Sequence, residues 1–177
     1  NYTGSSVTPA ANGNRFGGSN WAVGALSTSK YIQFTVTPNA GYVFSPTSFD
    51  FIWDFSGSGP KSVTLRSSAD GYVSDLGSLT TMTASSSTVK SISISGLTNI
   101  SASTTFRLYG YDATGTGGTG GFDCASSANN VVLNGFVSQL PAPSITSSLT
   151  ATGTVGTVFT YATTASNSPS SYAATGL

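Results

Sequence analysis

The chain has no histidine and no glutamate, and only 7% of its 177 residues are charged. Acid–base or nucleophilic catalysis would therefore depend on aspartate, lysine or tyrosine. Asp50 and Asp54 share one face of an expected strand, but they lie about 13 Å apart along it, too far for the carboxylate pair of a glycosidase. Aspartates from different strands can still meet in the fold. We expect a protein without catalytic residues and not an enzyme.

The chain also lacks net charge, since six aspartates balance six lysines and arginines. Electrostatics therefore gives no reason to expect nucleic acid or an anionic membrane as a partner. No apolar run approaches the roughly 20 residues of a membrane helix, and no basic segment followed by an apolar stretch opens the chain. We expect a soluble protein without membrane insertion, from which any export signal has been removed.

Cysteine is nearly absent as well, because Cys124 is the only one. A single cysteine excludes an intramolecular disulfide and a cysteine-based metal cluster. No histidine or nearby basic residue in the sequence would lower the pKa of its thiol, so a small apolar side chain is favoured over a reactive nucleophile.

What the chain has in abundance is Ser, Thr, Gly, Val, Tyr and Phe, which favour strands and turns over helices. Short alternating segments separated by turn residues predict about eight strands up to Val137, at the spacing of a sandwich. The clearest segments are "KYIQFTVTP", "TSFDFIWDF", "KSVTLRSS", "TVKSISISGL", "TTFRLYGY" and "NNVVLNGFV". The glycine run over residues 115–121 has no lysine and no following helix, so we expect a surface loop and not a phosphate-binding loop.

The composition changes where Pro141 and Pro143 stiffen the chain. We therefore expect a β-sandwich over residues 1–138, a linker over 139–144, and a separate segment over 145–177. That segment has about three short strands, which cannot close a core alone. Either the parent protein continues beyond residue 177, or the segment pairs with a neighbouring chain as an added strand.

Six motifs follow one another between residues 14 and 137. They are "YIQFTVTPNAGY" (31–42), "SFD" (48–50), "GP" (59–60), "RSSADGY" (66–72), "FRLYGY" (106–111) and "NNVVLNG" (129–135). The series resembles the β-sandwich modules of secreted multidomain bacterial proteins, and its closing strand is similar to that of jelly-roll modules of the galactose-binding type. The resemblance implies a jelly-roll sandwich and secretion, and many such modules bind polysaccharides.

Some modules of that type hold a structural calcium ion through an aspartate at the position of Asn129. The departure at Asn129 leaves a calcium ion unsupported, and the loop aspartates form no Asp-x-Asp-x-Asp pattern. We expect each of these aspartates to be a solvated turn residue. No cofactor and no metal site is predicted.

The last part of the chain resembles the first half of an immunoglobulin-like repeat found in long bacterial surface proteins. The resemblance is carried by "PSITSS", "GTVFTY", "NSPSSY" and the closing "GL". It implies that residues 145–177 are a partial immunoglobulin-like segment.

Side-chain alternation in "TTFRLYGY" directs Phe106 and Leu108 to the core and places Arg107, Tyr109 and Tyr111 on the opposite face. Arg66 likewise lies opposite the core-facing residues of its own strand. Trp21 stands in the turn-like "GGSNWAVG", without apolar periodicity, and is the candidate for an exposed ring, whereas Trp53 is expected in the core. These five residues, Trp21, Arg66, Arg107, Tyr109 and Tyr111, are the candidate carbohydrate-binding residues, because sugars need aromatic faces and planar polar groups. The alternative is that the arginines and tyrosines only cover the outer side of the sheet.

Together these features favour a non-catalytic extracellular or cell-surface module that binds a polysaccharide on behalf of a larger protein. The alternative is a structural stalk, adhesin or filament subunit in which residues 143–177 pair with the next protomer.

Overall fold

The computed structural model describes residues 1–12, 15–85, 87–123, 131–167 and 169–173, so Cys124 and Asn129 lie outside the described residues. The chain divides into two compact units, Asn1–Ser138 and Gln139–Leu177. Among the described residues, no helix is long and apolar enough to cross a membrane.

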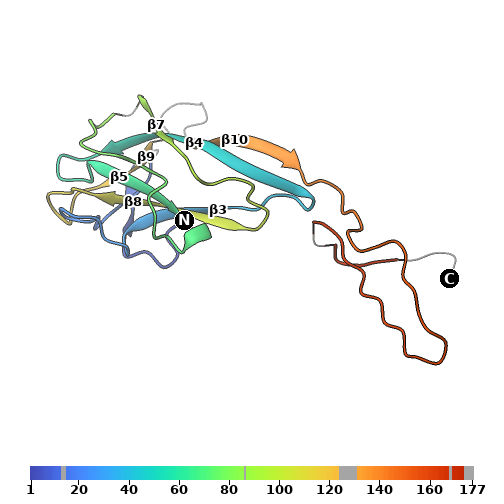
Figure 1. Ribbon diagram of the computed structural model, residues 1–177. Coiled ribbons are helices and arrows are strands. Elements are labelled where there is room, and N and C mark those ends of the chain that lie inside the picture. The colour runs from blue at the N-terminus through green and yellow to red at the C-terminus, as the bar shows by residue number, and fades with distance from the viewer. Residues whose placement is uncertain (13–14, 86, 124–130, 168, 174–177) are drawn as a thin grey trace. The chain divides into compact units, whose positions relative to one another are not determined.

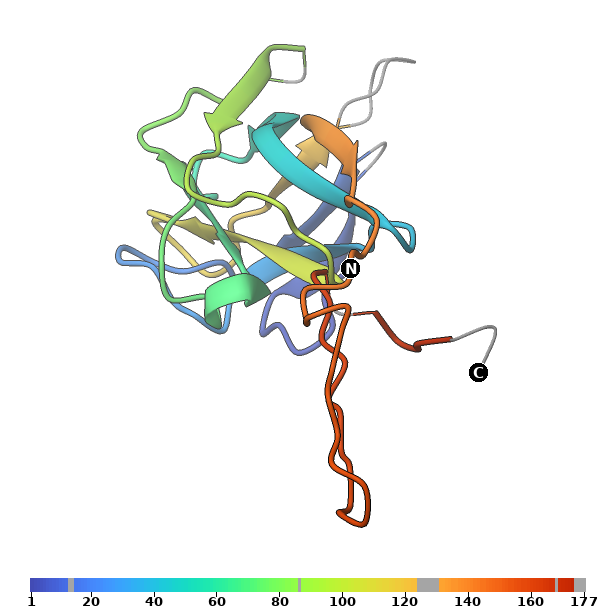
Figure 2. The same ribbon diagram turned by 45° about the vertical axis from the view of Figure 1, so that its right-hand side comes forward.

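The first unit consists of two antiparallel sheets packed face to face (Figures 1 and 2). Its strands are β1 (Thr8–Asn12), β2 (Arg15–Ser19), β3 (Tyr31–Val36), β4 (Tyr42–Phe55), β5 (Ser62–Ser67), β6 (Gly77–Leu79), β7 (Val89–Ser93), β8 (Thr104–Tyr111), β9 (Gly120–Asp123) and β10 (Val131–Gln139). One sheet contains β2–β9–β4–β7, extended by β1 beside β2 and by β10 beside β4, and the other is β3–β8–β5–β6. The chain alternates between the sheets from β2 to β5 and from β6 to β9, whereas β1–β2, β5–β6 and β9–β10 each stay within one sheet. The two packed antiparallel sheets confirm the predicted all-β sandwich.

The core between the sheets follows from the alternation seen in the sequence. Phe49, Phe51 and Trp53 of β4 are at most 1% exposed, and Phe106 and Leu108 of β8 face them from the other sheet. Burying each of these side chains contributes about 2 kcal/mol. The expected core position of Trp53 is confirmed.

The glycine run departs from the expected surface loop. Gly120 and Gly121 are buried in β9, which lies between β2 and β4. A Cβ atom at Gly121 would lie 2.3 Å from the Cα atom of Gly17 on β2, so only glycine permits this close approach. The expected loop over 115–121 was therefore wrong in its last two residues.

Beyond Gln139, the last residue of β10, the second unit has no strand among its described residues, where about three were expected. Two stretches of it run antiparallel through one bridge, Ile145 to Ala165, and the backbone N–H of Thr146 donates to the Thr164 carbonyl oxygen at 2.8 Å. We call residues 139–173 the C-terminal ribbon. Apolar side chains on it are open to solvent, among them Leu149 at 88% and Val158 at 94% exposed.

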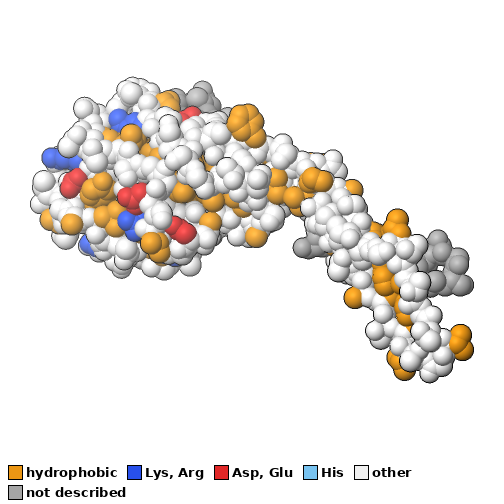
Figure 3. Space-filling model, viewed as in Figure 1, with side chains coloured by type: hydrophobic (Ala, Val, Ile, Leu, Met, Phe, Trp, Pro, Cys, Tyr) orange, Lys and Arg blue, Asp and Glu red, His pale blue; other side chains and the backbone are white. Residues whose placement is uncertain are grey.

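Charge is distributed unevenly along the chain. All lysines, arginines and aspartates lie between Arg15 and Asp123, so the C-terminal ribbon carries none. In Figure 3 the ribbon accordingly has only white and hydrophobic surface, whereas the few charged side chains lie on the sandwich.

Candidate functional site

The candidate site lies on the outer face of the β3–β8–β5–β6 sheet, the side turned away from the core. Strand pairing sets Gln33 and Arg66 directly opposite Arg107, one from each neighbouring strand. In the same way, Tyr31 lies directly opposite Tyr109. Residues directly opposite each other in antiparallel strands share a face, so two transverse rows of side chains are formed.

The row that contains Tyr109 is covered. Tyr31 is 3% and Tyr109 is 1% exposed, and their rings meet edge to face at 5.5 Å. The N-terminal residues lie over Tyr31, whose hydroxyl donates to the Thr3 carbonyl oxygen at 3.2 Å. Burial is also the main cause that raises the pKa of Tyr109. The expectation that Tyr109 offers its ring to a ligand is wrong, because this ring supports the face from below.

The second row remains half-buried and is centred on Arg107. The Arg107 guanidinium carbon lies 4.1 Å from the centre of the Tyr31 ring and 3.8 Å from that of Tyr72. Its Nε donates to Gln33 Oε1 at 3.1 Å. The guanidinium is thus held between two aromatic rings, an arrangement that cation–π attraction stabilises by about 1 kcal/mol per ring.

Tyr72 reaches Arg107 because of the turn that follows β5. The short 3₁₀ helix η1 (Ser68–Asp70) ends at Gly71 with φ +73°, and Tyr72 itself has φ +66°. The Asp70 carboxylate holds this turn by accepting the backbone N–H of Val73 at 3.2 Å and that of Ser74 at 2.8 Å. A left-handed backbone conformation at a tyrosine costs about 1 kcal/mol or more of folding free energy. The hydrogen bonds of the turn therefore hold Tyr72 over Arg107 in an otherwise unfavourable conformation.

Arg66 fixes the other side of the same turn. Its Nε donates to Asp75 Oδ1 at 2.6 Å, and its Nη1 donates to the Tyr72 carbonyl oxygen at 3.1 Å. Tyr111, the last residue of β8, is half-buried on this outer face. The structure therefore gathers Arg66, Arg107, Tyr109 and Tyr111 on one face, as the alternation predicts, but it adds Tyr72, which the sequence pattern did not single out.

Trp21 lies elsewhere, and the expectation of an exposed ring is wrong. Its side chain is fully buried, and the indole N–H donates to the carbonyl oxygens of Gly18 at 2.8 Å and Gly120 at 3.2 Å. The ring packs edge to face on Trp53 at 5.6 Å. The turn-like sequence around it has no apolar periodicity because this segment supplies one large side chain to the core and then leaves it.

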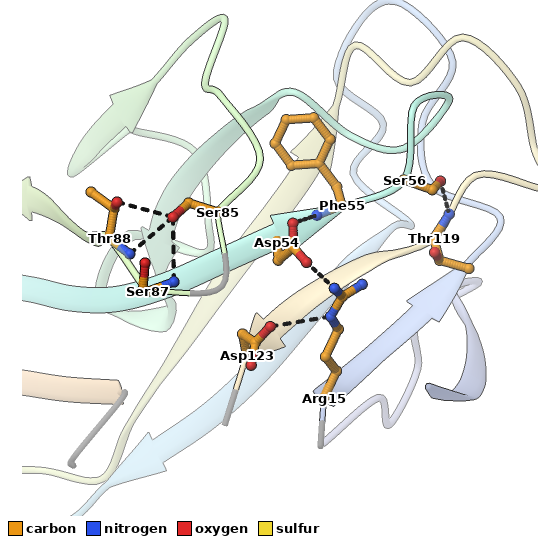
Figure 4. Close-up of polar contacts among 9 residues, drawn as sticks. All are labelled: Arg15, Asp54, Phe55, Ser56, Ser85, Ser87, Thr88, Thr119 and Asp123. Atoms are coloured by element: carbon orange, nitrogen blue, oxygen red, sulfur yellow. Dashed lines mark hydrogen bonds and ion pairs between the residues drawn. The ribbon is translucent and has the colours of Figure 1, made fainter. Parts of the chain in front are cut away.

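A second charged cluster lies on the other sheet, where Arg15 of β2 reaches Asp54 of β4 and Asp123 of β9 (Figure 4). Asp123 is 3% exposed, so the expectation that it is a solvated turn residue is wrong. The Arg15 guanidinium faces both carboxylates. We interpret this ion-pair cluster as part of the packing of the sandwich and not as a ligand site. Within the described ranges, no group of three or more His, Cys, Asp or Glu side chains could hold a metal ion.

A groove that sequence reasoning missed lies at one end of the sandwich. It has a volume of about 530 Å³ and is lined by Val36, Thr37, Pro38, Asn39, Tyr42, Phe44, Leu133 and Val137. This volume is in the range of ligand sites. Its most exposed aromatic ring is Tyr42, at 42%. The sequence signal for the groove is the glycine at position 41, because glycine is typical of a turn. In the structure Gly41 has φ +81° and turns the chain just before β4.

Comparison with known proteins adds no assignment to this geometry: no family model, curated protein or solved structure matches the chain.

Proposed function

We propose that the sandwich is a non-catalytic carbohydrate-binding module and that it binds saccharide on the outer face of β3–β8–β5–β6. The binding residues are Arg66, Tyr72, Arg107 and Tyr111. The observation that carries the proposal is the Arg107 guanidinium, held between Tyr31 and Tyr72 on a half-buried face.

This arrangement suits saccharides for two reasons. A sugar ring has an apolar side that packs on aromatic rings, and its hydroxyls are recognised by planar polar groups in fixed orientations. Arg107 and Gln33 are fixed by their mutual hydrogen bond, so little side-chain entropy is lost when they bind. An extracellular or cell-surface location is part of the proposal and depends on the resemblance to secreted modules.

Affinity electrophoresis against a panel of soluble polysaccharides tests the proposal. At least one polysaccharide should retard the full chain, and Tyr72→Ala, Tyr111→Ala and Arg107→Ala should each weaken this retardation by about tenfold or more, the loss expected for one good contact. Tyr42→Ala, which changes the groove at the end of the sandwich, is the matched control and should bind like the parent.

Two outcomes would overturn the proposal. One is that no polysaccharide retards the chain. The other is that Tyr42→Ala loses binding while the outer-face variants keep it, which would assign the ligand to the groove.

A structural role is the second candidate, and the C-terminal ribbon favours it. Leu149, Val155 and Val158 are each at least 88% exposed, and the ribbon has no charged side chain to discourage pairing of its edges. If the ribbon pairs with the next protomer, the full chain should associate as its concentration rises, and deletion of residues 143–177 should abolish this. A full chain that stays monomeric in sedimentation at high concentration would exclude this role.

A further inference from the structure

We propose that the outer face selects acidic saccharides, with the carboxylate of a uronic acid bound at the edge of the Arg107 guanidinium. This inference rests on the proposed function and names its substrate class.

The two aromatic rings limit how a ligand can reach the Arg107 guanidinium. The Tyr31 and Tyr72 rings both lie against the guanidinium, with centres 4.1 Å and 3.8 Å from its carbon, so we infer that a ligand reaches the group at its edge. Gln33 accepts the Nε–H of Arg107. The terminal amino groups carry four N–H donors, and parallel N–H groups of this fork match the two oxygens of a carboxylate.

The three arginines of the chain differ in whether a carboxylate balances their charge. Arg15 pairs with Asp54 and Asp123, and Arg66 pairs with Asp75. Across the described part of the chain, Arg107 pairs with no carboxylate. A half-buried cation is costly without a counter-charge, and an incoming anion would supply it.

The neighbouring groups strengthen this preference. Arg66 stands directly opposite Arg107 on β5, and the carboxylate of Asp75 pairs with Arg66. The Asp70 carboxylate is exposed and accepts two backbone N–H groups of its own turn. The row Gln33–Arg107–Arg66 therefore contains one arginine that is paired with a carboxylate and one, Arg107, for which the described residues supply none.

The test compares matched saccharides by isothermal titration calorimetry on the full chain. Polygalacturonate should bind, and its fully methyl-esterified form should bind at least tenfold more weakly, because esterification removes the charge and leaves the sugar ring unchanged. Arg107→Lys should lose most of the difference between the two forms, since a lysine ammonium keeps the charge but has no planar fork. Lys90→Gln, which removes a cation from β7 on the other sheet, is the matched control. This variant should keep the difference in affinity between the two forms.

Three results would overturn the inference. Equal binding of the two galacturonate forms would mean that the carboxylate is not recognised. Dextran sulfate that binds as tightly as polygalacturonate, with the same loss in Lys90→Gln, would mean attraction to diffuse charge. Unchanged discrimination in Arg107→Lys, with a thermal unfolding midpoint equal to that of the parent, would mean that Arg107 is not the contact.

The two levels of the proposal can fail separately. If only neutral saccharides bind and the outer-face variants lose them, the acidic preference is wrong while the carbohydrate-binding function stands. If no saccharide of either kind binds, both are wrong.

Discussion

The Trp21 ring packs directly against the backbone of Gly110, which leaves no space there for a side chain. A Cβ atom at this position would lie 2.6 Å from Cε3 of the Trp21 ring, which is fully buried and cannot move aside freely. Gly110→Ala should therefore destabilise the sandwich by about 1–3 kcal/mol, the usual cost of overpacking. Urea unfolding followed by tryptophan fluorescence measures this change.

Gly57→Ala is the control for that substitution. A Cβ atom there would meet nothing within 4 Å, so the free energy of unfolding should change little. Equal losses at the two positions would contradict the packing explanation.

The Arg15 cluster allows a second prediction at the scale of single residues. Arg15→Ala leaves Asp54 and Asp123 buried without their guanidinium, so the free energy of unfolding should fall by about 3 kcal/mol. A double-mutant cycle of Arg15→Ala with Asp54→Ala should give a coupling energy well above that of the exposed pair.

The exposed pair for this comparison is Arg66 with Asp75, whose carboxylate side chain is 48% exposed. Its coupling should stay below about 1 kcal/mol. The prediction fails if the buried cluster couples no more strongly than this pair.

At the scale of elements, the turn after β5 should respond to acid. Hydrogen bonds from the backbone, first that of Ser74, lower the pKa of Asp70 below its usual 3.8. A carboxyl group with a lowered pKa stabilises the folded state above its unfolded pKa, and this stabilisation is lost as the pH falls through the lowered value. Asp70→Ala should therefore be less stable than the parent at neutral pH, and the difference should shrink below about pH 3.8.

Equilibrium unfolding of the parent and of Asp70→Ala, from neutral pH into that acidic range, measures the effect. A difference that grows as the pH falls would have the wrong sign for this explanation.

The sequence predicts which face of a strand each side chain occupies wherever apolar and polar residues alternate. Phe106 and Leu108 face the core, and Arg107, Tyr109 and Tyr111 share the other face. Alternation assigns a face, but it does not say which residues of that face another segment covers. Tyr109 is covered in part because residues without periodicity, at the start of the chain, lie over the neighbouring Tyr31.

The same limit explains two other errors. Trp21 is buried by a segment that enters the core only once, so no repeating pattern marks it. In β9, a side chain at Gly121 would collide with Gly17 of β2 and one at Gly120 with Pro60, so the need for glycine there comes from tertiary structure alone. Tyr72 was missed because its position depends on the left-handed backbone of a turn, which the pair Asp70–Gly71 signals only in part.

At the scale of the whole chain, the two units should be thermally independent. The core residues of the sandwich all lie within residues 7–122, and the second unit adds none of its own. Deletion of residues 143–177 should therefore shift the midpoint of thermal unfolding by less than about 2 °C, which corresponds to less than 1 kcal/mol in a domain of this size. Differential scanning calorimetry measures the shift, and a drop of several degrees would show that the sandwich needs the ribbon.

The absence of charge beyond Asp123 has a consequence for proteolysis. Trypsin cleaves after lysine and arginine, and the last such residue is Arg107 in β8, so the ribbon offers trypsin no cleavage site. Chymotrypsin cleaves after large apolar residues, and Leu149, Phe159 and Tyr161 are exposed on the ribbon. Brief digestion with chymotrypsin should therefore cut the ribbon, and digestion with trypsin should leave the ribbon intact.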